Sequence, residues 1–489
     1  MKLNYKRTIY IGLAFFIISM FWVVYDNIIA KMLINYFGLN QTASGVVMAL
    51  DNIVALFMLP LFGALSDKTK SKYGKRTPYI VIGVLLSAVF FIGVGIFGTA
   101  QQKALEDSNI PEVEEIVVDD KVIGYSFGDL EFKPQEGEET KKLYEYKELA
   151  LKEHEIAARA VSQDNMGYLI GFIVILCIVL IIMSIYRTPA VSLMPDVTPK
   201  PLRSKANAII NLMGTVAGIL CLGIIMVNEM FFKTYMFTFI LLPVLMVGFL
   251  ILFLIKIKEP ELVQEFNDQY PEEVDVVEET TVKEKMPKDV RKSFMLILLS
   301  VVFWFMAYNA ATSKFSVYAG NVLNTMFTTP LQVAYITAAI AFIPIGIVAS
   351  KIGRKKTIII GILILLVAFL IGSFLTEKTK GLIYVTMGLA GIGWATINVN
   401  SYPMVVEMSK SSNIGKYTGY YYTASMAAQI ITPVLSGLVM DGFFIKSLGT
   451  DMRRLFPYSV VFCVLALITM LQVKHGDAKP IPSEVQMDD

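Results

Sequence analysis

Three ionisable side chains interrupt stretches of the chain that are otherwise apolar. Asp26 lies in MFWVVYDNIIAKML (20–33), Asp51 in the next apolar stretch and Arg187 in a later one. A charge at the centre of a bilayer costs roughly 2.5–3.5 kcal/mol even on the most lenient insertion scale, and such residues are by default functional. A carboxylate that burial drives towards its neutral form can bind and release a proton.

The three residues are therefore predicted to form a cation-coupling site. Asp26 is the leading proton carrier and Asp51 the second, because one stretch runs outward and the next inward, which places both carboxylates in the outer half of a membrane. Arg187 is the expected counter-charge. The alternatives are an ion pair that only holds helices together for Asp26, a hydrated outer position for Asp51, and an anchor near the inner face for Arg187.

The composition indicates a membrane protein and excludes several other classes. Of 489 residues, 55% are hydrophobic and 17% charged, with a mean hydropathy of +0.60, whereas a soluble domain carries about 25% charged residues. The three cysteines lack CxxC or Cys/His spacing, so neither a disulfide framework nor a metal site is expected. Both histidines lie outside the apolar stretches and no P-loop sequence occurs, so we expect no enzyme, no ATP hydrolysis and no cofactor.

Twelve stretches are long and apolar enough to cross a bilayer, which takes about 20 residues. They are 8–34, 42–66, 78–99, 166–194, 205–228, 235–256, 292–318, 329–350, 356–375, 381–405, 415–439 and 454–473. Lys and Arg are concentrated in every second loop, beginning with DKTKSKYGKRT (67–77). The positive-inside rule then predicts a multi-pass cell-membrane protein with both termini in the cytoplasm.

The spans fall into two groups of six. We expect a six-helix bundle in 1–256, a charged cytoplasmic linker in 257–291, a second six-helix bundle in 292–473 and a cytoplasmic tail in 474–489.

An acidic segment, 101–165, separates the third and fourth spans on the predicted extracytoplasmic side. EEIVVDDKVIGYSFGDLEFK indicates a hairpin that turns at Asp119–Lys121, and KKLYEYKELALKEHEIAARA indicates a helix that extends the fourth span outward. We interpret the segment as a solvated appendage, since acidic runs are usually solvated. Ligand gating or partner docking is the alternative.

An internal repeat relates the two groups of spans. FWVVYDNIIAKMLINYFG (21–38) matches FWFMAYNAATSKFSVYAG (303–320) at an offset of 282 residues, and Asp26 stands opposite Tyr308. Parallel six-span repeats are typical of the major facilitator architecture, in which the solute site lies at mid-membrane between two rocking halves. The carboxylate is present in one half only, as expected of a cation site in that half.

The loop after the second span carries a predicted gating motif. A glycine permits close helix approach, and a carboxylate at a helix end can pair with basic loop residues. Such contacts can latch one side of a transporter. The motif consists of Gly63, Asp67, Gly74, Lys75 and Arg76.

Polar residues at helical spacing predict a substrate site. Thr418, Tyr422, Ser425, Gln429, Thr432 and Ser436 form a stripe along the eleventh span, and the repeat places Asn207, Asn211, Gly214 and Gly218 of the fifth span opposite its first members. Sugar recognition combines such groups with aromatic platforms, while helix–helix packing is the alternative. The predicted substrate-binding residues are Trp22, Tyr25, Asn207, Asn211, Tyr308, Asn309, Trp394, Asn398, Tyr422 and Gln429.

The stretch MLPLFGALSDKTKSKYGKRTPYI (58–80) resembles the signature between spans two and three of the sucrose and maltose proton symporters. The matching positions are Pro60, Gly63, Ser66, Asp67, Ser71, Gly74, Arg76 and Pro78. The segment from Pro195 to Gly218 is similar to their fourth-to-fifth span stretch. These proteins belong to the glycoside–pentoside–hexuronide cation symporters of the major facilitator superfamily. The resemblance to them implies cation-coupled sugar transport.

Two positions depart from relatives within that group. Melibiose carriers have two sodium-binding aspartates on the second span, where this chain has Ala55 and Leu59. Plant sucrose carriers have an arginine five residues before the counterpart of Asp196, where this chain has Val191 and its nearest arginine is Arg187. The first departure favours protons over sodium.

The sequence thus predicts an all-α membrane protein of twelve helices that imports a neutral sugar or glycoside, such as sucrose or maltose, with a proton. Its expected partners are the sugar, the proton (or sodium) and the lipid bilayer, with no nucleic acid, and it is expected to be a monomer. A lysolipid or amphiphile carrier of the same fold and a sugar sensor without transport are the alternatives.

Overall fold

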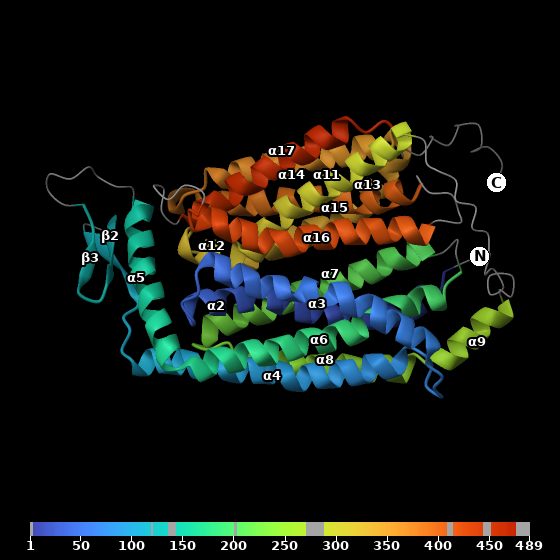
Figure 1. Cartoon of the computed structure of the whole chain (residues 1–489), viewed down its shortest axis with the longest axis horizontal. Coiled ribbons are helices and arrows are strands. Elements are labelled where there is room, and N and C mark those ends of the chain that lie inside the picture. The colour runs from blue at the N-terminus through green and yellow to red at the C-terminus, as the bar shows by residue number, and fades with distance from the viewer. Residues whose placement is uncertain are drawn as a thin grey trace. The chain divides into compact units, whose positions relative to one another are not determined.

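The computed structural model (Figure 1) describes residues 3–118, 121–134, 143–199, 203–269, 288–407, 414–443 and 451–475. Linker residues 270–287 and the tail from 476 onward lie outside the described residues. The chain divides into two compact units. Unit 1 comprises Met1–Asp275, Ser313–Thr328 and Pro433–Met452, and unit 2 comprises Val276–Thr312, Thr329–Thr432 and Arg453–Asp489.

Unit 1 is built mainly from the first six apolar helices. They are the continuous path α1 (Tyr5–Val24), η1 (Tyr25–Ile29) and α2 (Ala30–Asn35), followed by α3 (Gln41–Lys68), α4 (Thr77–Asp107), α6 (Met166–Asp196), α7 (Arg203–Phe231) and α8 (Met236–Lys256). Helix α1 packs on α7, and α4 packs on α6 and α8. The rings of Phe21, Phe91 and Phe239 join α1, α4 and α8, with centroids about 5 Å apart.

The segment between α4 and α6 folds as a small domain on the ends of these helices (Figure 1). Strands β1 (Val113–Val118), β2 (Lys121–Phe127) and β3 (Leu130–Phe132) form an antiparallel sheet in the order β1-β2-β3. It packs on α5 (Leu143–Asp164) through Tyr125, Tyr146 and Ala150. We call residues 108–164 the insert, and the helix ends beside it the insert side.

The predicted hairpin and helix of the insert are both confirmed, but α5 does not extend the fourth span. The backbone leaves helical geometry at Asn165 (φ −115°, ψ 42°), and α5 then runs across the helix ends (Figure 1). A continuous helix was expected here, although Asp164, Asn165 and Gly167 are all poor helix formers and mark the break locally.

Unit 2 contains most of the second group of helices. They are α11 (Lys288–Ser313), α13 (Thr328–Ile352), α14 (Arg354–Ser373), η3 (Glu377–Leu382), α15 (Ile383–Glu407), the greater part of α16 (Ile414–Met440), η6 (Met452–Arg454) and α17 (Leu455–Leu471). Helix α14 packs on α15 and α17. The short helix α12 (Phe315–Asn321) and the last turns of α16 belong to unit 1.

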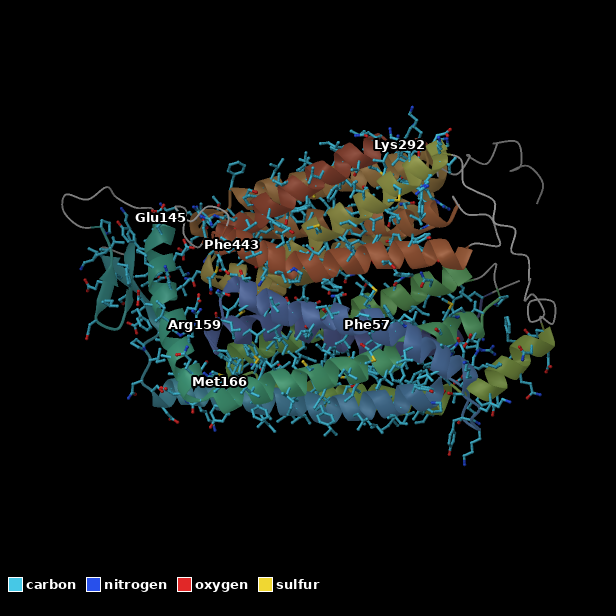
Figure 2. All side chains as sticks on the ribbon, viewed as in Figure 1. Phe57, Glu145, Arg159, Met166, Lys292 and Phe443 are labelled. Carbon is cyan, nitrogen blue, oxygen red and sulfur yellow. The ribbon has the colours of Figure 1, made fainter. Side chains whose placement is uncertain are left out.

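Helix lengths and compositions agree with a multi-pass membrane protein. Within the described residues, 11 helices are long and apolar enough to cross a membrane, and the eighth predicted span corresponds to α13, where Thr328–Phe342 is a shorter apolar helix. Apolar side chains on the outside of these helices stay exposed, such as Phe57 on α3 (Figure 2). Such exposure is expected where lipid surrounds the helices.

A carboxylate from the linker region caps the first turn of α4. The first N–H groups of a helix have no partner within the helix, and Arg76, Thr77 and the preceding Lys75 all donate their backbone N–H to Glu259, at 2.7–3.1 Å. Glu259 is the first residue of α9 (Glu259–Gln269) and is only 1% exposed. One buried side chain therefore joins α9 to the start of α4.

We expect Glu259→Gln to destabilise this junction, because an amide presents one acceptor and an N–H₂ group to donors that need two acceptors. Capping interactions contribute about 0.5–2 kcal/mol. The measurement is thermal unfolding in detergent together with hydrogen exchange of the peptide that spans residues 74–79. Glu261→Gln is the control, because Glu261 is exposed and its one ion pair among the described residues is with Lys258. Equal stability and exchange in the two variants would contradict the capping role.

Candidate functional site

Asp26 lies in an irregular turn of the first apolar helix. Residues Tyr25–Ile29 form the π-helical turn η1 between α1 and α2. Such turns contain an extra residue, interrupt the regular hydrogen-bond ladder and are frequent at functional sites. Asp26 keeps intermediate exposure, while Tyr25 and Asn27 beside it are buried. The turn therefore presents one carboxylate from an otherwise buried segment.

Asp51 and Arg187 lie within electrostatic range of Asp26, so the structure brings the three residues of the predicted coupling site together in unit 1. The Tyr25 hydroxyl donates to the backbone carbonyl of Met48 at 3.1 Å, which ties η1 to α3 one turn before Asp51. An oxygen of Asp51 accepts a hydrogen bond from the side-chain amide of Asn52 at 2.7 Å. Within the described residues, no donor hydrogen-bonds to the carboxylate of Asp26.

Arg187 on α6 connects this cluster to an aromatic ring. Its guanidinium lies 5.2 Å from the centroid of the Trp22 ring, within the range of a cation–π interaction. The Trp22 indole Nε1 is buried and has no hydrogen-bond partner among the residues that the structure describes. An orphaned buried donor of this kind calls for a water or a ligand.

Unit 2 carries a second cluster, which is aromatic and amidic. The rings of Tyr308 on α11 and Trp394 on α15 stack with centroids 5.9 Å apart, and Phe342 of α13 meets Trp394 edge-on at 5.7 Å. Next to Tyr308, the Asn309 Nδ2 is buried without a partner in the described part of the chain. Asn398, one turn after Trp394, keeps intermediate exposure.

The two predicted polar stripes, on α16 and α7, have different surroundings in the structure. On α16, Gln429 donates its side-chain amide to the carbonyl of Ser425, and Tyr422 is exposed. The side chain of Thr418 lies outside the described part. On α7, Asn207 is exposed and Asn211 is half-buried, but a Cβ added at Gly214 would meet Phe15 and Ser19 of α1. That part of the α7 stripe therefore serves helix packing.

The gating motif forms a charged network at the ends of α3, α4 and α6. Arg76 is 4% exposed and donates to Asp67 and Ser66, and its Nε donates to Asp196 at 2.8 Å. Lys75 also pairs with Asp196, at 3.2 Å. Burial by itself lowers the pKa of Arg76, but the hydrogen bonds and charges of Asp196 and Asp67 outweigh it and raise that pKa. Arg76 therefore stays charged.

The two glycines of the motif have steric roles. Gly74 adopts φ +99°, and a Cβ at this position would collide with the side chain of Glu259. Gly63 faces Thr188 of α6, whose Cγ2 lies 3.1 Å from the position of an added Cβ. A larger residue at either position would push these elements apart.

Three charged residues with structural roles were not predicted from the sequence. Glu259 was counted as part of a linker. Lys314 lies in the seventh predicted span, is fully buried and donates to the carbonyl of Gln41 at 2.8 Å. Asp441 accepts from the backbone N–H of Thr42 at 2.8 Å and of Gln41 at 3.3 Å. The charge of Lys314 within an apolar stretch was a usable signal, whereas the other two lie at helix ends where charges are common.

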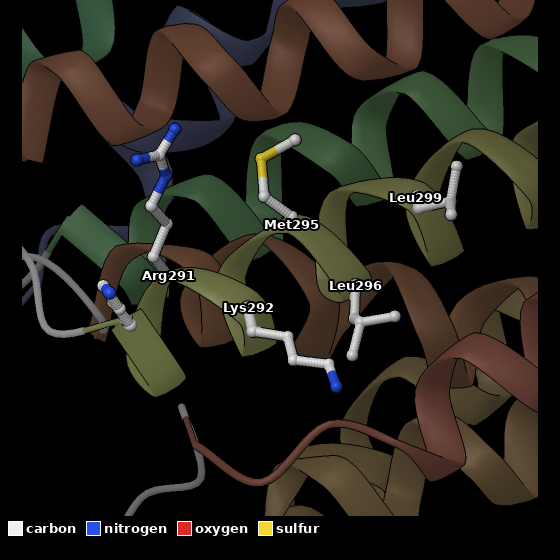
Figure 3. Close-up of a pocket in the computed structure, with 6 residues that line it drawn as sticks. Arg291, Lys292, Met295, Leu296 and Leu299 are labelled. Atoms are coloured by element: carbon white, nitrogen blue, oxygen red, sulfur yellow. The ribbon is translucent and has the colours of Figure 1, made fainter.

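A hollow of about 460 Å³ lies beside the first turns of α11 (Figure 3). Its lining comes from one helix and consists of Lys288, Arg291, Lys292, Met295, Leu296 and Leu299. It contains none of the predicted substrate residues, and its lining side chains offer no acceptor for a sugar hydroxyl. The coupling cluster of unit 1 and the aromatic cluster of unit 2 are therefore the better candidate sites, each taken by itself.

Two family models match separate parts of the chain. One described as MFS/sugar transport protein matches residues 10–100, and one described as Major Facilitator Superfamily matches residues 321–485. A lactose permease of Lactobacillus helveticus is 39% identical over 74 residues, and the MFS-type transporter ppzB of Metarhizium rileyi is 25% identical over 166 residues. These alignments span 13% and 33% of this chain, and 12% and 34% of the two relatives.

Solved structures are similar over nearly the whole chain. A D-xylose–proton symporter has a TM-score of 0.59 at 14% identity, with 98% of both chains covered. A nucleoside transporter has a TM-score of 0.59 at 13% identity, covering 96% of this chain and 100% of that one. Together with the helices described above, this likeness identifies the fold: the chain is an all-α membrane protein with the fold of the major facilitator superfamily.

Proposed function

We propose that this protein is a secondary transporter that carries a neutral sugar or glycoside together with a proton by alternating access. The observation that carries the proposal is the cluster of Asp26, Asp51 and Arg187 in the apolar helices of unit 1. The match of residues 10–100 to a sugar-transport model supports the substrate class. That stretch includes both carboxylates.

Asp26 is the proposed proton carrier. Asp51 already accepts a hydrogen bond from Asn52, which favours the charged form of a carboxylate. No donor within the described residues bonds to Asp26, so no such hydrogen bond favours the charged form of its carboxylate. Arg187 is close enough to favour the charged form once the proton has left. Asp26 and Arg187 together thus allow both a protonated and a deprotonated state of the Asp26 carboxylate.

The aromatic cluster of unit 2 is the proposed sugar platform. Stacked Tyr308 and Trp394 rings offer the apolar faces on which a sugar ring packs, and the orphaned amide of Asn309 offers a donor to a hydroxyl. Asn398, Tyr422 and Gln429 are further proposed contacts. The orphaned indole of Trp22 in unit 1 is another.

The membrane orientation of the chain and its division into two helix bundles are part of the same proposal. The distribution of Lys and Arg supports cytoplasmic termini in the cell membrane, which places the insert outside. Residues 1–256 and 292–473 are the proposed bundles, and 257–291 the linker. A monomer suffices for this mechanism.

Replacement of the proton carrier separates coupling from transport. In proteoliposomes with a pH gradient of one unit, a one-proton symporter accumulates sugar about tenfold, because both ratios correspond to about 1.4 kcal/mol. We expect Asp26→Asn to lose this accumulation and to retain sugar exchange, since Asn cannot carry the proton. The measurement is labelled-sugar uptake with a panel of neutral disaccharides and glycosides. The control is Asp107→Asn, at an exposed end of α4. Undiminished accumulation by Asp26→Asn would contradict the assignment.

Replacement of the platform tests the substrate class. We expect Trp394→Leu to raise the KM for exchange at least about tenfold and to leave kcat within about twofold, because loss of a packing face weakens ground-state binding. Phe303→Leu is the control, since the Phe303 ring packs only against Phe462 among the aromatic rings described. Equal KM values in both variants, or no exchange of any sugar by the unmodified protein, would contradict the proposal.

A further inference from the structure

The turn between α2 and α3 is held through three consecutive backbone carbonyls. The carbonyl of Tyr36 accepts from the Gln101 amide of α4 at 3.1 Å. The carbonyl of Phe37 accepts from the Ser162 hydroxyl at 3.0 Å, and that of Gly38 from the Arg159 guanidinium at 3.0 Å. Two of the three donors therefore come from α5 of the insert.

These donors form a connected arrangement and not three separate contacts. The Gln101 amide also donates to the Ser162 hydroxyl at 2.9 Å, and both side chains are buried. Gly38 adopts φ +63°, and a Cβ at this position would collide with the backbone of α5 at Glu155 and Arg159. The backbone of α5 thus lies directly against the turn. Figure 2 shows Arg159 on α5, near the ends of the spanning helices.

Gln41 and Thr42, which follow this turn, contact residues of unit 1 that come from the second half of the sequence. Asp441 accepts from Gln41 N–H and Thr42 N–H, and its contact with the Thr42 hydroxyl is 2.5 Å. Lys314 donates to the Gln41 carbonyl. Three residues of chain separate Phe37 from Gln41, so an ordered turn fixes the docking surface.

The contact is also made by backbone against backbone. A Cβ at Gly45 would collide with the carbonyl of Pro433, and one at Gly437 would lie 2.6 Å from the carbonyl of Gln41. Helices that approach this closely depend on small residues. A small displacement of the start of α3 would therefore break the contact.

We propose that α5 of the insert, through Arg159 and Ser162, is a brace that positions the start of α3 for a gate formed with Asp441 and Lys314. Gln101, Arg159 and Ser162 are positioning residues, since none of them belongs to the proposed coupling or sugar clusters. The inference deepens the proposed function, because a gate has meaning only in a transporter that alternates between states. It replaces the interpretation of the insert as a solvated appendage.

Glu155, beside Arg159 on α5, interacts electrostatically with Asp441 of the proposed gate. Burial and then the charge of Asp441 raise the pKa of Glu155, while Arg159 and Lys152 oppose them. Arg159 pairs with Glu155 at 2.6 Å. The sheet adds a further contact, as Glu115 of β1 accepts from Asn324 just after α12 at 2.8 Å. The insert therefore contacts both the α2–α3 turn and the segment that follows Lys314.

Hydrogen exchange measures directly whether the gate is formed. The backbone amides of Gln41 and Thr42 are hydrogen-bonded to Asp441 only while the start of α3 and the end of α16 are in contact. We expect Ser162→Ala and Arg159→Ala each to increase exchange of peptides covering residues 39–44 and 437–443 by at least about fivefold. Exchange in residues 67–77, at the other ends of the helices, stays unchanged. The protein is the full chain in detergent or nanodiscs, without substrate.

Three further variants keep the result interpretable. Gln163→Ala, next to Ser162 and exposed on α5, must behave as the unmodified protein, and Arg159→Lys is expected to restore part of the protection. Asp441→Asn must accelerate the same peptides, and adding Arg159→Ala to it must have little further effect, since coupled residues act non-additively. Unchanged exchange in Ser162→Ala and Arg159→Ala, or uniform acceleration across all helices, would overturn the brace.

The exchange result does not depend on the cargo, so it is separable from the proposed function. If no sugar is transported but the brace variants open residues 39–44, the proposed substrate is wrong and the brace stands. If sugar is transported with proton coupling and the brace variants exchange and transport like the unmodified protein, the brace is wrong and the proposed function stands.

Discussion

The cost of leaving a polar or charged group unpaired in an apolar surrounding governs this molecule. Arg76 is buried with two carboxylates, Glu259 is buried against three backbone donors, and Lys314 is buried against a carbonyl. Each of these groups lies at a helix end and holds two elements together. Asp26 lies within a helix and lacks a donor in the described part of the chain. That contrast supports Asp26, and not the buried charges at the helix ends, as the proposed proton carrier.

The same constraint explains where irregular backbone occurs. A π-helical turn disturbs the regular ladder at residues 25–29, and there the side-chain amide of Asn27 donates to the backbone carbonyl of Val23 at 2.8 Å. The turn at residues 36–38 would leave its carbonyls without partners, and side chains of α4 and α5 supply the donors. Both irregular segments flank α2. The first carries the proposed proton site, and the second leads into the proposed gate.

The fold followed from the sequence because hydropathy is strong over whole spans. Eleven of the predicted spans correspond to long apolar helices, and the hairpin and helix of the insert were also expected. The helical start of the linker at Glu259 was not, since its burial depends on contacts with the distant start of α4. The break at Asn165 and the third strand were also not predicted, although Gly167 and the turn at Gly128 are local signals for them.

The candidate site was predictable in part. Charges in apolar stretches drew attention to Asp26, Asp51 and Arg187, which the structure brings within electrostatic range. A periodic polar face was a weaker signal, because spacing alone cannot distinguish a cavity from packing; Gly214 of α7 packs against α1. The bracing of the α2–α3 turn left no pattern, since it uses backbone carbonyls that every residue possesses.

Proton movement during sugar entry is the most direct measure of proton-coupled sugar transport. Proteoliposomes in weakly buffered medium would receive a sugar from the panel at equal internal and external pH, with external pH recorded. We expect the medium to become alkaline at the rate of sugar entry. A protonophore should abolish this pH change, and replacement of sodium by choline should leave it unaffected. Sugar entry without a pH change, or entry that requires sodium, would contradict this expectation.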